Sequence, residues 1–168
     1  MVLIRDYRKE DAPAVRDMMQ RLAKQRRESS HEMVLRDEYA RFFPAYLESF
    51  LQNPDSIMKV AESNGKVIGY AIATRGREAP FFKYSRVAKL SDVYVEESQR
   101  KHGVAHDLLA SLEDWATRSG LQALEVDVFP EHSEEIRALQ GLGFVEYRIK
   151  FLRPLEAEPP AKPRASKA

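Results

Sequence analysis

The segment from Arg100 to Ala105 lies between a predicted strand and a predicted helix, and its residue types suit the binding of an anion. The first N–H groups of a helix have no partner within it and carry partial positive charge, so the backbone itself can hold a phosphate there. Gly103 and Ala105 are small enough for a diphosphate to approach closely, and Arg100 and Lys101 add positive charge. An ordinary turn would also explain Gly103, so the segment alone indicates only an anion site.

The elements around this segment follow from the spacing of apolar residues. Alternation and turn signals predict strands over residues 2–7, 57–62, 66–74, 87–95, 121–129 and 144–152. Asn64-Gly65 favours a type I′ turn between the second and third of these strands. Helical spacing predicts a helix capped by Asp11, an irregular helix bent at Pro44, and helices over 104–118 and 133–142.

This order of elements predicts an α/β (α+β) fold. It implies a mixed sheet with helices on both faces and at least one parallel crossover. We expect one domain over residues 1–155, followed by a disordered tail over 156–168 that is rich in Pro, Ala and Lys.

Composition excludes several classes of function. The 27 basic side chains nearly cancel the 26 acidic ones, so we expect no binding to nucleic acid or to a membrane surface. Cysteine is absent, which excludes a disulfide framework, a thiolate zinc site and a cysteine nucleophile. No apolar run reaches the ~18 residues of a membrane span, and we expect a cytoplasmic protein.

Several segments together resemble the GNAT superfamily of N-acetyltransferases. Arg100 to Ala105 is similar to its acetyl-CoA-binding pattern, Gln/Arg-x-x-Gly-x-Gly/Ala. Asp92 to Val95 resembles the family's fourth strand, and Leu124 to Phe129 followed by Leu142 to Phe144 resembles its fifth strand and Gly-Phe signature. Neither the dinucleotide-binding nor the Walker glycine pattern is present.

The resemblance implies a GNAT fold of about six to seven strands, with two splayed central strands between which the pantetheine arm of acetyl-CoA lies. It implies that the arm bonds the backbone of Val93 and Val95, and that the diphosphate bonds the turn. The implied cofactor contacts are Val93, Val95, Arg100, Lys101, His102, Gly103, Val104, Ala105, His106 and His132. His102 and His106 have the spacing of a metal site but no third ligand, so we expect no metal there.

The reaction implied is transfer of acetyl to a primary amine of a small molecule, a protein or a peptide, by direct attack in a ternary complex. An amine of pKa ~10 must lose a proton before it attacks. Asp92 is the first candidate base and Asp127 the second, either directly or through water. Asp92 is equally explained as a carboxylate that pairs with an arginine or orients a loop.

One departure from the family concerns the general acid. Where the family has a tyrosine, four residues before the Gly of Gly-Phe, this chain has Leu139. We prefer that the thiolate, of pKa ~8.5, leaves unassisted or that Tyr94, Tyr147 or His132 supplies the proton. His132 also suits a helix-capping or surface role, and it stands where the family has an asparagine. The alternative function is a non-catalytic acyl-CoA-binding or regulatory module. GNAT proteins are often dimers, so the resemblance allows a homodimer.

Overall fold

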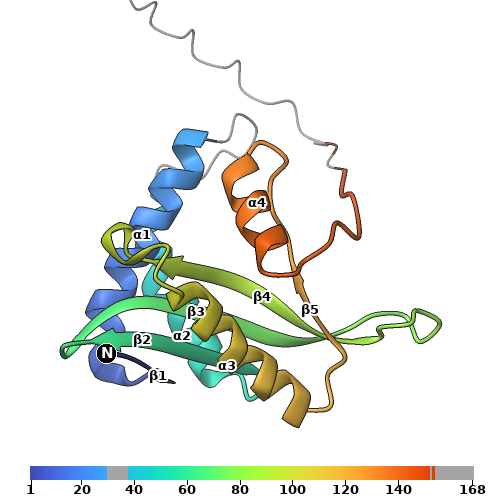
Figure 1. Cartoon of the computed structure of the whole chain (residues 1–168), viewed down its shortest axis with the longest axis horizontal. Helices are drawn as coiled ribbons and strands as arrows, with labels where there is room; N and C mark the ends of the chain where they lie inside the picture. The colour runs from blue at the N-terminus through green and yellow to red at the C-terminus, as the bar shows by residue number, and fades with distance from the viewer. Residues whose placement is uncertain (30–37, 152, 154–168) are drawn as a thin grey trace, which may run out of the picture.

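A computed structural model of the chain describes residues 1–29, 38–151 and 153. Its centre is a five-stranded sheet whose strands follow one another in space as they do in sequence (Figure 1). The first four strands are antiparallel, and the fifth runs parallel to the fourth. The strands are β1 (Val2–Asp6), β2 (Ser56–Ser63), β3 (Lys66–Arg77), β4 (Arg86–Val95) and β5 (Ala123–Val126). The mixed sheet is therefore confirmed.

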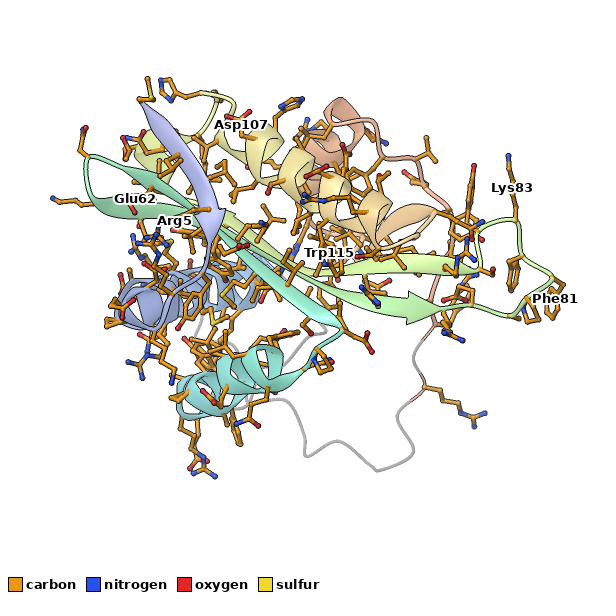
Figure 2. The ribbon with its side chains drawn as sticks, turned by 90° about the horizontal axis from the view of Figure 1, so that it is seen from below. Arg5, Glu62, Phe81, Lys83, Asp107 and Trp115 are labelled. Carbon is orange, nitrogen blue, oxygen red and sulfur yellow. The ribbon has the colours of Figure 1, made fainter. Side chains whose placement is uncertain are left out.

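Helices cover both faces of this sheet, as predicted. Figure 2 shows helices on both sides of the sheet. The first face carries α3 (Val104–Arg118), and the second carries α1 (Ala12–Ser29) and α2 (Phe43–Gln52). Helix α4 (Ser133–Gly141) lies beside the end of α1 (Figure 1). No helix in the described part of the chain has both the length and the apolar composition needed to cross a bilayer.

The two faces of β3 explain the two halves of the core. Tyr70 and Ile72 point to the α1 side, whereas Ala71 and Ala73 point to α3, because strand side chains alternate. Leu108 and Leu112 recur at helical spacing on α3 and are fully buried. Burying one such side chain contributes about 1.5–3 kcal/mol.

The end of the chain differs from the prediction. Residues 144–151 form no strand, and the described sheet has five strands rather than six or seven. Strand β5 is also shorter than the predicted 121–129. The alternation after Phe144 is a genuine strand pattern, but no strand of the described chain pairs with it. The predicted tail over 156–168 lies outside the described residues.

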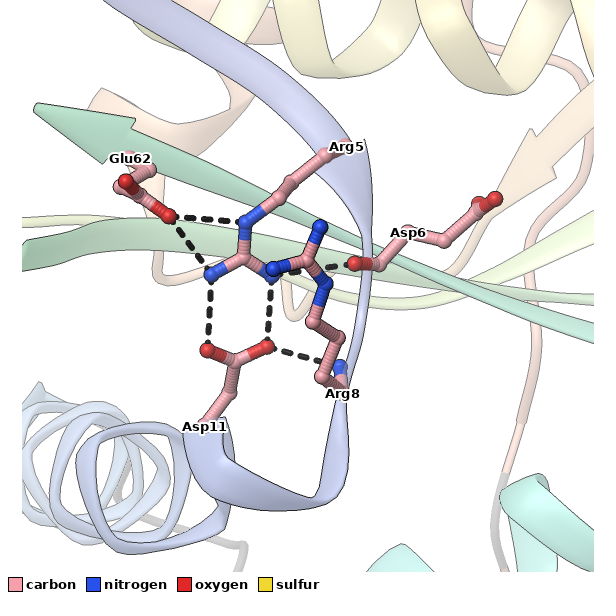
Figure 3. A network of polar contacts seen from close by, with 5 residues as sticks. All are labelled: Arg5, Asp6, Arg8, Asp11 and Glu62. Atoms are coloured by element: carbon pink, nitrogen blue, oxygen red, sulfur yellow. Dashed lines mark hydrogen bonds and ion pairs between the residues drawn. The ribbon is translucent and has the colours of Figure 1, made fainter. Parts of the chain in front are cut away.

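Two local predictions near the N-terminal half have different outcomes. Asn64 and Gly65 both have positive φ, 50° and 73°, which confirms the type I′ turn. Asp11 does not cap α1 but ends the short 3-10 helix η1 (Lys9–Asp11). Figure 3 shows its carboxylate bound by both terminal nitrogens of Arg5, at 2.7 and 2.9 Å, and by the Arg8 N–H at 2.7 Å. Asp11 thus ties β1 to the start of α1.

Candidate functional site

The central strands β4 and β5 separate halfway along β4. Their pairing runs from Val87 opposite Ala123 to Leu90 opposite Val126 and then ends. At the same point β4 has a bulge, because the neighbouring residues Ala73 and Ile72 of β3 pair with Leu90 and Asp92 and leave Ser91 without a partner on β3. The last residues of β4 therefore have a free edge on the β5 side, which confirms the splayed pair.

Two residues of β4 direct their backbone groups to this free edge. Glu96 donates its N–H to Ile68 in β3 at 2.8 Å. Since backbone groups alternate along a strand, those of Val93 and Val95 point away from β3. The carbonyl oxygen of Val95 accepts a bond from Arg100 Nε at 3.1 Å, which shows the same direction. A ligand lying in the gap would therefore meet the backbone of both valines.

The turn after β4 presents a series of free N–H groups. Lys101 and Gly103 have positive φ, 65° and 82°, and α3 begins at Val104. The first helical bond runs from Asp107 N–H to the Gly103 carbonyl. Within the described residues, the N–H groups of 101–106 have no backbone acceptor. A Cβ built on Gly103 meets no atom within 4 Å, so the space beside it is open.

The side chains of the turn do not all point to the same place as its free N–H groups. Arg100 folds back to the end of β4, with its guanidinium 5.9 Å from the Tyr94 ring centroid. Lys101 and His102 are exposed, and His106 lies 3.4 Å from the Asp107 carboxylate on the surface. No group of three or more metal-binding side chains occurs among the residues that the structure describes.

Asp92 belongs to a buried charge cluster that joins three elements. Its Oδ1 lies 2.8 Å from Nη1 of Arg26 in α1, and its side chain is 10% exposed. Arg26 also approaches Glu135 in α4, at 3.8 Å, and Glu135 lies 3.2 Å from Nδ1 of His132. The pairing of Asp92 with an arginine was one of its two predicted roles.

Burial dominates the electrostatics around Asp92. It raises the pKa of Asp92, although the Arg26 guanidinium opposes this shift by favouring the charged carboxylate. Burial likewise raises the pKa of Tyr70, and it raises the pKa of Tyr46 to about 12. The Tyr70 hydroxyl has no hydrogen-bond partner among the described residues, although the tyrosine is fully buried and interacts with Asp92 and Arg26. A polar group that is buried and unpaired is unusual outside functional sites.

The other candidate residues do not all join this cluster. Tyr94 packs on the α1 side of the sheet, and burial raises its pKa. Asp127 is 77% exposed and pairs with Lys150, so its described contacts lie away from Asp92. Tyr147 is 53% exposed beside Arg148. His132 is buried, precedes α4 and contacts Phe129 as well as Glu135, and none of these contacts belongs to the turn.

Residue types alone did not identify Arg26, Glu135 and Tyr70 as members of the cluster. Arg26 did carry a signal, because it follows Met19 by seven residues and Leu22 by four and so extends the apolar stripe of α1. A charged residue on such a stripe requires a buried partner. Tyr70 and Glu135 had no comparable signal.

A hollow of about 660 Å³ lies between α1 and the end of β4. Two of its lining residues, Arg21 of α1 and Glu96 after β4, bond each other at 2.7 Å. The hollow is lined by Arg21, Lys24, Gln25, Glu28, Tyr94, Glu96, Glu97 and Ser98.

Proteins with similar sequences are named as acetyltransferases. The chain matches the model of the "Acetyltransferase (GNAT) family" over residues 17–144. It is 32% identical to aminoglycoside N(6')-acetyltransferase type 1 of Salmonella typhimurium over 108 residues, 63% of this chain and 74% of that protein. It is 28% identical to the uncharacterized N-acetyltransferase YhfO of Bacillus subtilis over 110 residues, 61% of this chain and 72% of that protein.

Solved structures extend the similarity to the whole fold. Aminoglycoside N-acetyltransferase AAC(6')-Iy in complex with CoA has a TM-score of 0.75 and 26% identity, with 92% of this chain and 95% of that chain covered. The same enzyme with a bisubstrate analogue, CoA-S-monomethyl-acetylneamine, has a TM-score of 0.70 and 26% identity, with 92% and 98% covered. The chain therefore belongs to the GNAT acetyltransferase family, as an N-acetyltransferase that takes its acetyl group from acetyl-CoA.

Proposed function

We propose that this enzyme acetylates a primary amine of a small molecule that carries several amino groups, by direct attack on acetyl-CoA in a ternary complex. The observation that carries the proposal is the position of Asp92. It lies where β4 and β5 separate, beside the gap proposed for the thioester and on the face that holds α1. The acetyl group of acetyl-CoA would reach this point from the gap between β4 and β5, and the amine substrate would reach it from the face that holds α1.

The turn supports a position for the cofactor. Free N–H groups over 101–106 at the start of α3 suit a diphosphate, which needs donors and positive potential. Gly103 leaves open space beside the chain, which allows close approach. The pantetheine arm would continue along the free edge of β4 and bond Val93 and the Val95 N–H, because Arg100 already donates to the Val95 carbonyl.

The chemistry requires a proton acceptor and a place for negative charge. Asp92 would accept the amine proton through water, and its buried environment raises its pKa toward that of a useful base. Its Oδ2 accepts no bond within the described residues and so is available to that water. A backbone N–H near Val95 would stabilise the carbonyl oxygen as charge develops. The thiolate, of pKa ~8.5, would leave unassisted, since Leu139 cannot donate a proton.

The hollow beside α1 supports the class of acceptor. Its volume of about 660 Å³ is in the ordinary range for small-molecule sites, ~300–1,000 Å³. Its lining holds three carboxylates, Glu28, Glu96 and Glu97, against two cations, Arg21 and Lys24. The net charge of the lining is therefore −1, which favours a cationic ligand. Two relatives of this chain are named for acetylating aminoglycosides, which are amines of this kind.

A thiol-release assay with a panel of acceptors tests the acceptor class. We expect turnover with aminoglycosides or other small polyamines and none with peptide amines. Turnover confined to peptides would replace the small-molecule proposal. Cofactor binding without turnover on any amine would favour the binding module instead.

The substitution Gly103→Ala tests the cofactor position. The new Cβ would stand where the diphosphate is proposed to approach, so we expect the CoA dissociation constant in calorimetry to rise at least about tenfold. Gly120→Ala is the matched control, because Gly120 has a similar φ of 69° and similarly open space but ends α3 instead of starting it. Equal effects of the two substitutions would show only backbone strain, about 1–2 kcal/mol in each.

A further inference from the structure

Helix α4 reaches the proposed active site through an acidic residue, Glu135. None of the nine residues of α4, all of them within the described chain, is buried. The helix meets α1 in a charge contact, in which Glu135 Oε1 lies 3.8 Å from Nη2 of Arg26. Nη1 of the same arginine bonds Asp92 Oδ1 at 2.8 Å. A single guanidinium therefore faces two carboxylates that come from different elements.

The two carboxylates around Arg26 differ in their access to water. The side chain of Asp92 is 10% exposed, whereas that of Glu135 is 36% exposed. When both are ionised, two negative charges and one positive charge leave the trio with a net charge of −1. Burial penalises an uncompensated charge, so a proton taken up by the trio goes to the more buried carboxylate. That carboxylate is Asp92, the proposed base.

We propose that Glu135 is a positioning residue for acetyl transfer, because it shares the Arg26 guanidinium and so keeps that arginine from holding Asp92 in its ionised form. This inference rests on the proposed role of Asp92 as the base. Glu135 would act through Arg26 and would not contact the acetyl group or the amine.

The direction of the effect follows from the charges that face Asp92. Burial raises the pKa of Asp92, the Arg26 guanidinium lowers it, and the negative charge of Glu135 raises it. Tyr70 of β3 and Tyr46 of α2 also face Asp92, and burial keeps both uncharged at neutral pH by raising their pKa. Of the charged groups that act on Asp92 in the described chain, Glu135 is therefore the one that opposes Arg26.

A second contact holds Glu135 in place. Its Oε2 lies 3.2 Å from Nδ1 of His132, the buried residue that precedes α4. Each oxygen of Glu135 thus has a partner of its own, since Oε1 faces Arg26. The carboxylate is therefore kept beside the arginine although its side chain is partly exposed.

The Arg5 cluster shows why the charge of Glu135 matters at Asp92. Arg5 also faces two carboxylates, Asp11 and Glu62, but it donates two hydrogen bonds to Asp11. These bonds lower the pKa of Asp11. Asp92 accepts one bond from its arginine within the described chain. Its affinity for a proton therefore depends more on the charges around the pair, of which Glu135 is one.

The pH dependence of kcat/KM tests this role, with an amine that the wild-type enzyme acetylates. Glu135→Gln removes the charge but keeps the size of the side chain, so Arg26 would act on Asp92 without opposition. We expect the acidic midpoint of the profile to move to lower pH. We also expect the plateau rate to fall about two- to threefold, because a carboxylate with a lower proton affinity is a weaker general base. Ionisation of the amine is common to all variants and cancels in the comparison.

Two further variants separate this role from a structural one. Glu134→Gln is the matched control, since Glu134 is exposed in the same first turn of α4 and carries the same charge. It should leave the midpoint unchanged. Glu135→Asp keeps the charge and should retain a profile close to that of wild type. Thermal unfolding shows whether each variant is folded, and an NMR titration of the Asp92 carboxyl carbon measures its proton affinity where turnover is low.

The same measurements distinguish the two ways in which the inference could fail. An Asp92→Asn variant with the wild-type rate and profile would remove Asp92 as the base and this inference with it. If Asp92→Asn loses activity but Glu135→Gln shifts neither the kinetic midpoint nor the NMR titration more than Glu134→Gln does, the role of Glu135 alone is refuted. A lower midpoint in both measurements, seen in Glu135→Gln and absent in Glu135→Asp, is the result we expect.

Discussion

Two buried aspartate–arginine pairs stabilise this molecule in different ways. Asp11 accepts two bonds from Arg5 and one from the Arg8 N–H, so both carboxylate oxygens are satisfied. Asp92 accepts one bond from Arg26, and its second oxygen has no partner among the described residues. The bonds to Arg5 lower the pKa of Asp11, whereas burial raises the pKa of Asp92.

The difference separates a structural pair from one that is suited to chemistry. The Asp11 carboxylate has both oxygens bonded within the protein, and its role is to join β1 and β2, through Arg5, to the start of α1. A carboxylate with a free oxygen, a raised pKa and an unpaired hydroxyl nearby can still take up a proton. The contrast leads to four predictions.

The largest expected effect is on stability. Asp11→Ala leaves Arg5 with Glu62 and the Asp6 carbonyl, and it leaves the Arg8 N–H with no acceptor, so we expect a loss of about 3–5 kcal/mol in the free energy of unfolding by urea. Asp6→Ala is the matched control. Asp6 pairs with Lys59 but is 77% exposed, so its loss should stay below about 1 kcal/mol. Similar losses from both variants would refute the structural role of Asp11.

The second effect is on catalysis. Asp92→Asn removes the proposed base, so we expect kcat to fall about 10²-fold, or roughly 2.7 kcal/mol of activation free energy. The amide oxygen can still accept the bond from Arg26, so stability should fall less than in Asp11→Ala. An unchanged rate and pH profile would leave Asp92 as a purely structural partner of Arg26.

The third effect is the pH dependence of stability, which should have opposite signs for the two pairs. The pKa of Asp11 is lowered by folding, so its contribution is present above the ~3.9 of an unfolded aspartate and is lost as the pH falls below it. The pKa of Asp92 is raised, so its contribution is present below ~3.9 and is lost as the pH rises through the folded value. The loss of unfolding free energy caused by Asp11→Asn should therefore grow as the pH rises from acid to neutral. The loss caused by Asp92→Asn should shrink over the same range, and unfolding curves of both variants at each pH measure the two trends.

The smallest effect concerns Tyr70. Because its hydroxyl has no partner, Tyr70→Phe should keep or slightly raise stability, by at most about 1 kcal/mol. The KM for the acceptor would rise if the hydroxyl contacts the amine or its water during turnover. A clear loss of stability would mean that the hydroxyl is bonded in the folded enzyme.

Local features of the site were predictable, because each depends on neighbouring residues. Gly103 and its surroundings indicated a turn that opens a helix, and the structure has that turn with free N–H groups. Asn64-Gly65 likewise indicated its own turn. The segment after Phe144 was predicted as a strand from its alternation alone, and this was wrong for the described chain because a strand also needs a neighbour.

The sequence by itself determined the order of elements, the anion-binding turn and the family, since periodicity and turn chemistry act over a few residues. Only the tertiary structure decided which charges meet. Arg26 and Asp92 are 66 residues apart, and Asp11 bonds Arg5 instead of capping its own helix. The physical reason is that a buried carboxylate takes whichever donors the packing of strands and helices brings within 3 Å, and that packing involves the whole fold.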